Sequence, residues 1–299
     1  MLKFFEVEAR FPEDTGKIPG PAVSYVAQRV KVPAEEWSAY DWAGRAIKRH
    51  RMEIRGAFGF RECTEEDIFG AGPGLGASVA RRFASEGFRV ALVARRKDRL
   101  DALVDQLSAE GIEAAGFTAD LSAPEEIPGL IESIRARFGR IDVIEYGPLP
   151  SVGFTPAAQL EPATLVQGMP LLVLTPLAVL QAVLPEWKER GDGAFLMTTG
   201  ATAVRPRAHA SGVGPLMAAA RNWLYSLNGE LAESGIYAGT LSIAAFITGS
   251  EAERAAAAAG DPLAAAQPRV DPAYLASLYW DMYTKRDRVE EVHPNLKTG

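Results

Sequence analysis

Apolar residues follow two different spacings along most of this chain, from about residue 66 onward. Short apolar runs, typical of buried parallel strands, alternate with segments whose apolar residues recur at helical spacing. The predicted strands are 68–69, 89–94, 114–119, 141–146, 194–199 and 237–243. The predicted helices are 77–84, 98–110, 123–138, a long apolar region that ends at Pro185, 216–233 and a segment from Asp271 to Arg288. This order predicts an α/β fold with a doubly wound parallel sheet, which binds ligands at the carboxyl ends of its strands.

The first predicted strand leads into a glycine-rich turn. Ile68 and Phe69 precede the sequence GAGPGLG at 70–76, and a helical pattern follows at once. Backbone N–H groups and the positive end of the helix dipole favour an anion at such a turn. Glycine lets the backbone approach a pyrophosphate closely. We therefore predict a Rossmann-type phosphate cradle, and its candidate contacts are Gly70, Gly72, Gly74, Leu75 and Gly76.

The spacing of the cradle resembles a known family. Three residues separate Gly70 from Gly74, and one separates Gly74 from Gly76, which is the pattern of short-chain dehydrogenases/reductases. The resemblance covers about residues 66–299. It implies a nicotinamide dinucleotide cofactor and an unidentified small-molecule substrate. It also implies adenine-side contacts from Asp120 and Leu121, a cofactor contact from Thr248, and a homodimer or tetramer that uses part of the apolar segment 169–183.

The residues after the second predicted strand favour NADP over NAD. Enzymes that bind NAD place an acid there for the ribose 2′-OH, whereas an arginine accommodates the 2′-phosphate of NADP. This chain has Arg95, Arg96 and Lys97 at that position and no carboxylate. The planar guanidinium groups of Arg95 and Arg96 suit a phosphate. The alternative is that these cations are only solvated at the end of a strand.

The usual catalytic residues of the family are absent. Its members carry a Tyr-x-x-x-Lys pair and a Ser thirteen residues before the Tyr. These side chains donate a proton to the reacting oxygen of the substrate and orient it. Counted back from the helix segment AAARNW at 218–223, these positions hold Met217 for Lys, Val213 for Tyr and Gly200 for Ser. Valine and methionine transfer no proton. The sequence also resembles an atypical branch of the family that has Glu-Tyr-x-Pro after the fourth strand, as in 145–148 here.

Three other residues are weak substitutes for the missing acid. Tyr146 ends a predicted strand, and Thr199 and His209 bracket the loop before the catalytic helix. Histidine has an ordinary pKa suited to proton transfer near neutrality. The alternative is structural: Tyr146 packs in the core, Thr199 ends a strand and His209 lies in a loop.

Residues 1–64 have a different character. A short amphipathic helix is predicted at 22–30 and a helix start at Pro33, and basic residues then gather between 45 and 55. The basic residues are Arg45, Lys48, Arg49, Arg51 and Arg55. Their simplest interpretation is a solvated helix face; the alternative is a surface that contacts DNA phosphates. Segments 4–12, 25–27, 30–33, 40–45 and 59–62 resemble the N-terminal region of class II (replicative) transposon transposases, where this region serves DNA recognition.

The two regions meet at Glu65, Glu66 and Asp67. These acids occupy positions where a central parallel strand is normally apolar, and burying unpaired carboxylates costs several kcal/mol. We infer a first strand that has lost its beginning. The predicted domains are 1–64, a small and mainly helical transposase-like extension, and 65–299, a dinucleotide-binding domain.

Composition excludes several classes of site. Cys63 is the single cysteine and only three histidines are present, so neither a disulfide framework nor a metal centre is expected. The net charge of −6 argues against nucleic-acid binding by the chain as a whole. No signal peptide pattern opens the chain, and 169–185 is interrupted by prolines and short for a membrane span, so a cytoplasmic location without membrane association is expected.

The leading interpretation is an NADP-binding protein of the short-chain dehydrogenase/reductase type without the usual catalytic residues. One alternative is a non-catalytic nucleotide sensor or scaffold. Another is a fusion product with residual DNA binding through residues 1–64.

Overall fold

The computed structural model describes residues 20–30, 33, 66–69, 74–148, 154–250, 252–254 and 267–296. The chain divides into two compact units, Met1–Cys63 and Thr64–Gly299. In the first unit the described helix is α2 (Gly20–Val30), close to the predicted 22–30. The predictions for the basic residues between 45 and 55 lie outside the described residues, as do those for Gly70 and Gly72.

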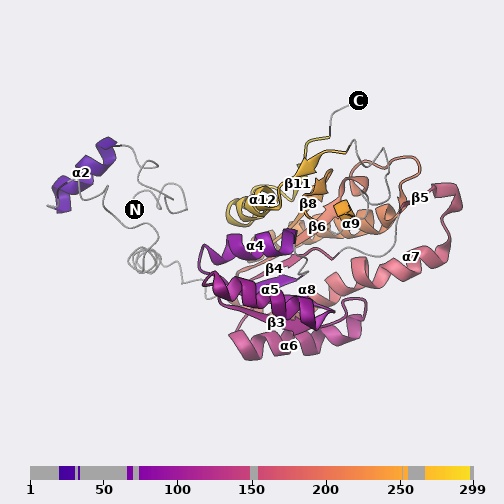
Figure 1. The fold of residues 1–299 in the computed structure, drawn as a ribbon, viewed down its shortest axis with the longest axis horizontal. Coiled ribbons are helices and arrows are strands. Elements are labelled where there is room, and N and C mark those ends of the chain that lie inside the picture. The colour runs from indigo at the N-terminus through magenta and orange to yellow at the C-terminus, as the bar shows by residue number, and fades with distance from the viewer. Residues whose placement is uncertain are drawn as a thin grey trace. The chain divides into compact units, whose positions relative to one another are not determined.

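A seven-stranded sheet forms the centre of the second unit (Figure 1). Its strands pair in parallel throughout. In spatial order they are β11 (Glu290–His293), β8 (Ile236–Ile243), β6 (Gly193–Gly200), β4 (Val143–Tyr146), β1 (Glu66–Phe69), β2 (Arg89–Ala94) and β3 (Ala114–Thr118). Strand order reverses between β1 and β4, as expected of the doubly wound sheet, so the predicted fold class is confirmed.

Helices cover both faces of the sheet. On one face α6 (Ile127–Phe138), α8 (Thr175–Arg190) and α9 (Val213–Leu231) enclose the main apolar core, which includes Ile144 and Phe195. On the other, α4 (Leu75–Ala84) and α12 (Pro272–Lys285) lie side by side, and α5 (Lys97–Ala109) packs against β2 and β3. The helix start predicted at Asp271 is confirmed: its side chain accepts a hydrogen bond from Ala273 N at 2.8 Å.

Short elements connect these helices and strands. They are η3 (Pro124–Glu126), β5 (Phe154–Thr155), η4 (Ala157–Gln159), η6 (Ala201–Ala203), β7 (Ser211–Gly212), η7 (Ala232–Ser234), β9 (Phe246–Ile247) and β10 (Arg269–Val270). β5 pairs antiparallel with β7, and β9 pairs in parallel with β10.

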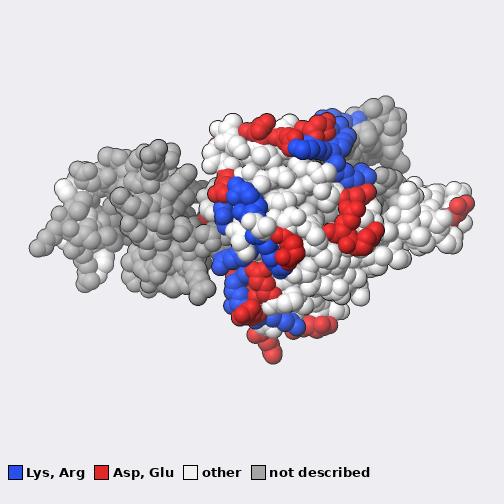
Figure 2. Space-filling view, turned by 90° about the horizontal axis from the view of Figure 1, so that it is seen from below, with Lys and Arg blue, Asp and Glu red and all other residues white. Residues whose placement is uncertain are grey.

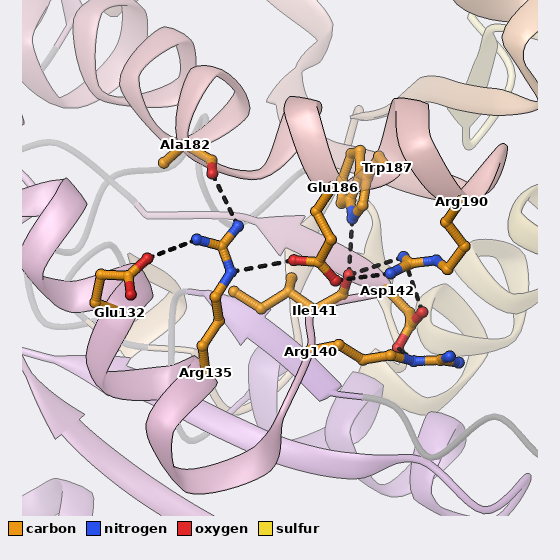
Figure 3. Close-up of polar contacts among 9 residues, drawn as sticks. All are labelled: Glu132, Arg135, Arg140, Ile141, Asp142, Ala182, Glu186, Trp187 and Arg190. Carbon is orange, nitrogen blue, oxygen red and sulfur yellow. Dashed lines mark hydrogen bonds and ion pairs between the residues drawn. The ribbon is translucent and has the colours of Figure 1, made fainter.

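The amino end of β4 carries a buried ion-pair network (Figure 3). Asp142 is 3% exposed and pairs with Arg140 Nε at 3.0 Å and Arg190 Nη2 at 2.9 Å. Burial raises the pKa of the Asp142 carboxyl to about 6, against the opposing effect of the two guanidinium groups. Trp187 Nε1 donates to the Ile141 carbonyl at 2.7 Å. This network fixes the end of the sheet opposite to the one where ligands bind in such folds.

Three details differ from the sequence prediction. β11 was not predicted. β1 begins at Glu66, with an irregular register before Ile68, so the shortened strand includes two of the acids at the junction. The long apolar helix starts as α7 (Pro162–Met169), passes through the π-helical η5 (Pro170–Leu174) and continues as α8 to Arg190, well beyond Pro185.

The same helical region is less buried than predicted. Val166 is 67% exposed, Leu174 42% and Met169 38%, because the α7 end projects from the sheet layers (Figure 1). In the view of Figure 2 this end is largely without charged side chains, whereas acidic and basic residues are interspersed elsewhere. The stretch Pro162–Arg190 has the length and hydropathy of a membrane span, and a third of its most apolar window is buried. A core helix passes the same test, so this is weak evidence for a membrane.

Candidate functional site

At the carboxyl edge of the sheet, Gly74 lies beside the segment after β8. Gly74 precedes α4 directly, and a Cβ built on it would lie 3.9 Å from Ser250 Cα and 4.0 Å from Ile247 Cγ2. Thr248 lies between those two residues, is exposed, and donates its backbone N–H to the Val270 carbonyl at 2.9 Å. Leu75 and Gly76 form the first turn of α4. Gly74 and Thr248 therefore lie in one neighbourhood, beside a helix N-terminus.

The ends of β2 and β3 lie side by side at the same edge. Ala119 N donates to the Ala94 carbonyl at 3.2 Å, which brings the segment at Arg95 and Arg96 next to the one at Asp120. Arg95 and Arg96 are exposed, and Arg96 is the N-cap residue of α5. Lys97, the third cation of the run, pairs with Asp101 across one helical turn at 2.7 Å.

Asp120 and Leu121 have different surroundings. The exposed Asp120 accepts the Ser122 backbone N–H at 2.9 Å, which shapes its turn. Leu121 is 6% exposed, and its carbonyl accepts the hydroxyl of Thr175 at 2.7 Å. Side-chain contact with an adenine is thus available at Asp120 rather than at Leu121, whose backbone sets the wall of this edge.

An apolar cluster contains Val213 and Met217, which the sequence predicts at the family's Tyr and Lys positions. Val213 and Met217, each 7% exposed, pack with Leu172, Ala203 and Leu216. The backbone N–H of Gly200, at the predicted Ser position, donates to Met217 Sδ at 3.1 Å. The folded chain thus brings Gly200 and Met217 into contact. Among the side chains of this cluster none can donate a proton to a substrate.

The weak substitutes lie in three different environments. Tyr146 is fully buried, its hydroxyl donates to the Leu171 carbonyl at 2.6 Å, and burial raises its pKa far above the usual range. Thr199 is 1% exposed and hydrogen-bonds the hydroxyls of Thr240 and Ser242 at 3.0 and 2.7 Å. His209 is exposed in a loop with φ of 63°. Tyr146 and Thr199 therefore serve packing in this conformation, and His209 alone of the three reaches solvent.

Family comparison gives a clear assignment. The family model described as short chain dehydrogenase matches residues 68–258, more than half of the chain. This chain belongs to the short-chain dehydrogenase family. A second model, described as a domain of unknown function (DUF4158), matches residues 1–72. The N-terminal region of this short-chain dehydrogenase thus has a separate, transposase-like relationship, as its sequence predicted.

Curated relatives match the dehydrogenase over parts of their length. A fatty acyl-CoA reductase of Mycobacterium tuberculosis is 36% identical over 127 residues, 42% of this chain and 43% of the relative. A short chain dehydrogenase of Pseudocercospora fijiensis is 29% identical over 179 residues, 56% of this chain and 55% of the relative. The chain therefore spans about half the length of these relatives.

Solved structures share the fold. The NADPH complex of an actinorhodin polyketide ketoreductase variant superposes with a TM-score of 0.68 at 21% identity, covering 76% of this chain and 94% of that one. A metagenomic short-chain oxidoreductase in complex with NADP gives 0.63 at 21% identity, covering 78% and 98%. At this identity the likeness establishes the fold of the dehydrogenase unit.

A buried polar cluster at the carboxyl ends of β4 and β6 was missed by sequence reasoning. Glu145 is 1% exposed, and the Thr198 hydroxyl donates to its Oε1 at 2.8 Å. Tyr279 of α12 lies with its hydroxyl 2.6 Å from Thr198 Oγ1. Burial raises the pKa of Glu145 to about 8, while its bonds to Thr198 and Tyr279 oppose the shift. The sequence signals were the Glu-Tyr-x-Pro pattern at 145–148 and a glutamate among apolar residues of the strand, and neither pointed to Thr198 or Tyr279.

A second network of this dehydrogenase joins the unpredicted strand β11 to α9. Glu290 accepts hydrogen bonds from Arg221 Nε at 2.8 Å, Ser242 Oγ at 2.7 Å and Tyr225 OH at 2.7 Å. Among the residues that the structure describes, no group of three or more His, Cys, Asp or Glu side chains is placed to hold a metal ion.

Proposed function

We propose that residues 65–299 bind NADP in preference to NAD and do not carry out the family's ordinary Ser/Tyr/Lys carbonyl reduction. The cofactor proposal is supported by the glycine-rich sequence before α4, by the closeness of Gly74 to the segment of Thr248, and by Arg95 and Arg96 at the end of β2. The solved relatives in complex with NADP or NADPH support the same choice. Bound NADP would supply hydride chemistry, and the chain would supply binding and orientation.

Arg95 is the residue through which we propose to distinguish the two coenzymes. It follows β2 directly and is exposed, and the same stretch offers no carboxylate for a ribose 2′-OH. Asp120, one strand further along the same edge, would lie beside the adenine. The 2′-phosphate would then be held by guanidinium groups, which present paired donors to its oxygens.

The contact between Gly200 and Met217 carries the second part of the proposal. A working site of this family needs a hydroxyl, a phenol and an ammonium at Gly200, Val213 and Met217. The thioether instead accepts the Gly200 amide, and Val213 lies in the same apolar cluster. These features support an atypical branch of the family, and they favour a nucleotide sensor or scaffold as the second candidate function. His209 stays the one weak substitute acid that is open to solvent.

Self-association is part of the proposal. The apolar side chains of Val166, Met169 and Leu174 are exposed along one helical region, and exposed apolar surfaces of this kind commonly serve subunit contacts. We propose a homodimer or tetramer that uses this surface, and a cytoplasmic location as expected from the sequence. DNA binding through residues 1–64 stays a prediction, to be tested by a salt-sensitive mobility shift with the full chain.

A fluorescence titration tests the cofactor proposal. We expect the full chain to bind NADPH more tightly than NADH, and Arg95→Asp to weaken NADPH binding by roughly tenfold or more while changing NADH binding little. Lys188→Asp is the matched control, because Lys188 is an exposed cation on α8 and the charge change is the same. Equal loss in both variants, or no binding of either coenzyme, would overturn the proposal. A panel of ketones and aldehydes should give no NADPH oxidation while binding persists.

A further inference from the structure

Glu145 is a fully buried acid that no cation neutralises among the residues described. Its neighbours are Thr198 from β6 and Tyr279 from α12, which meet it with hydroxyl groups. In register its partner on β6 is Leu196. On β1, Phe69 pairs with Tyr146 of β4, and Ile68 is the residue before Phe69. Among the side chains that the structure describes, Tyr279 is the titratable group that faces Glu145, and burial keeps the pKa of Tyr279 well above its ordinary value.

The chain leaves β4 directly over this cluster. A Cβ built on Gly147 would lie 2.6 Å from Glu145 Oε1 and 2.8 Å from Thr198 Oγ1, distances that no real Cβ tolerates without movement. The backbone at Gly147 thus rests on the carboxyl group and on the Thr198 hydroxyl. Any change in the size, charge or hydration of the carboxyl group is transmitted to the backbone at this strand end.

The cluster also connects to the glycine turn through two packed helices. Tyr279 belongs to α12, and the next residue, Trp280, packs against Phe83 of α4 with ring centroids 5.2 Å apart. Tyr283, one turn later, packs on Phe83 at 5.6 Å. Phe83 lies in the last turn of α4, and α4 begins right after Gly74, so movement of α12 would reach the helix N-terminus that we propose for the pyrophosphate by shifting α4 as a whole.

We propose that Glu145 is a positioning residue for the dinucleotide site, which fixes the backbone at Gly147 and, through Thr198 and Tyr279, holds α12 and α4 in place. This inference rests on the proposed binding of NADP. The carboxyl group acts in its neutral form: it accepts from Thr198 without requiring a buried counter-ion. Loss of its proton would place an uncompensated charge between β4, β6 and α12. Water would then enter the cluster to solvate this charge, and α12 would loosen.

The pH profile of NADPH binding tests this role. For the full chain we expect the dissociation constant to rise roughly tenfold or more between pH 7 and pH 9.5, as Glu145 ionises. Glu145→Gln, which keeps a neutral group of the same shape, should bind as the parent does at pH 7 and change less than about threefold up to pH 9.5. A purely structural role would not give a pH profile that the neutral variant abolishes. Circular dichroism at both pH values verifies that each protein is folded.

Asp142→Asn is the matched control, because Asp142 is a buried acid at the other end of β4. Its pH profile between 7 and 9.5 should parallel that of the parent chain. Parallel profiles for the parent chain and Glu145→Gln would overturn the inference. If neither protein binds NADPH at any pH, the cofactor proposal fails separately. Amide hydrogen exchange of 272–285 at pH 9.5 then decides: slower exchange in Glu145→Gln than in the parent supports the role of Glu145, and equal exchange overturns it.

Discussion

The amide of Gly200 donates a hydrogen bond to the thioether of Met217 over 3.1 Å, at the end of β6 and inside α9. By the register that the sequence predicts, a short-chain dehydrogenase with the usual catalytic residues would hold a hydroxyl and an ammonium at these two positions. Here the sulfur satisfies a backbone donor and also packs with apolar neighbours. The two residues therefore fit each other: the Met217 sulfur accepts the Gly200 amide and fills the space beside it.

Restoring the lysine alone should destabilise the fold. In Met217→Lys an ammonium replaces a 7%-exposed thioether within the apolar cluster, and we expect the free energy of unfolding to fall by about 2–4 kcal/mol in urea titrations. Met217→Leu keeps the volume and should cost less than about 1.5 kcal/mol. Unchanged stability of Met217→Lys would mean that this position opens to water or cofactor, contrary to a packed cluster.

Gly147→Ala should be costly although the change adds one methyl group. The new Cβ would collide with the Glu145 carboxyl and the Thr198 hydroxyl, so we expect a loss of about 1–3 kcal/mol in thermal or urea unfolding. Gly129→Ala is the control: it lies inside α6 with nothing within 4 Å of the built Cβ. There the substitution should stabilise by about 0.5–1 kcal/mol, because alanine is the better helix former. Similar effects at both sites would contradict the close contact at Gly147.

Glu145 should give stability a distinctive pH dependence. Its pKa is raised by burial from 4.5 to about 8, so the folded chain holds a proton that the unfolded chain releases. The corresponding stability is fully present below pH 4.5 and is lost as the pH rises through 8, at most roughly 5 kcal/mol in all. Urea midpoints of the parent chain and Glu145→Gln, compared from pH 5 to pH 9, should converge or cross in this window. A constant difference across the window would count against the shifted pKa.

Glu290 should show the opposite sign. Burial of the Glu290 side chain opposes its ionisation, but its bonds to Arg221, Ser242 and Tyr225 outweigh this effect and lower its pKa, so its contribution to stability is present above pH 4.5 and is lost as the pH falls. Glu290→Gln weakens three hydrogen bonds at once, and we expect a loss of about 1–3 kcal/mol at pH 7. Glu291→Gln on the same strand is the control, measured by urea unfolding, and should cost under about 1 kcal/mol. Equal losses would mean that β11 gains no special support from Glu290.

The spacing of apolar residues along the chain was sufficient to predict most of the strands and helices. The strands at 89–94 and 237–243 and the helix at 98–110 are recovered within one or two residues, because each presents an apolar side to the core. β11 was missed for a physical reason. Its residues Glu290 to His293 carry no apolar alternation, and the strand is held by partners from α9 and β8 that only the folded chain supplies.

The assignment of the catalytic positions stays a prediction, and the side-chain contacts at these positions could not be predicted from the sequence. Counting along the chain selected Gly200, Val213 and Met217, which the fold brings to one region. The Glu145 cluster was beyond such counting, since Thr198 and Tyr279 are 81 residues apart and meet across two elements. A glutamate in an apolar strand marks an anomaly, but its partners are a tertiary property.

The proton that Glu145 retains also changes the net charge of the whole molecule. Counted from its residues the chain carries −6 at neutral pH, which assigns a full negative charge to Glu145. With a pKa of about 8 that carboxyl is mostly uncharged at pH 7, so the native chain migrates as a species nearly one unit less anionic than its composition implies. On a native electrophoretic gel, Glu145→Gln and its parent would then run almost together near neutrality and separate only in alkaline buffer.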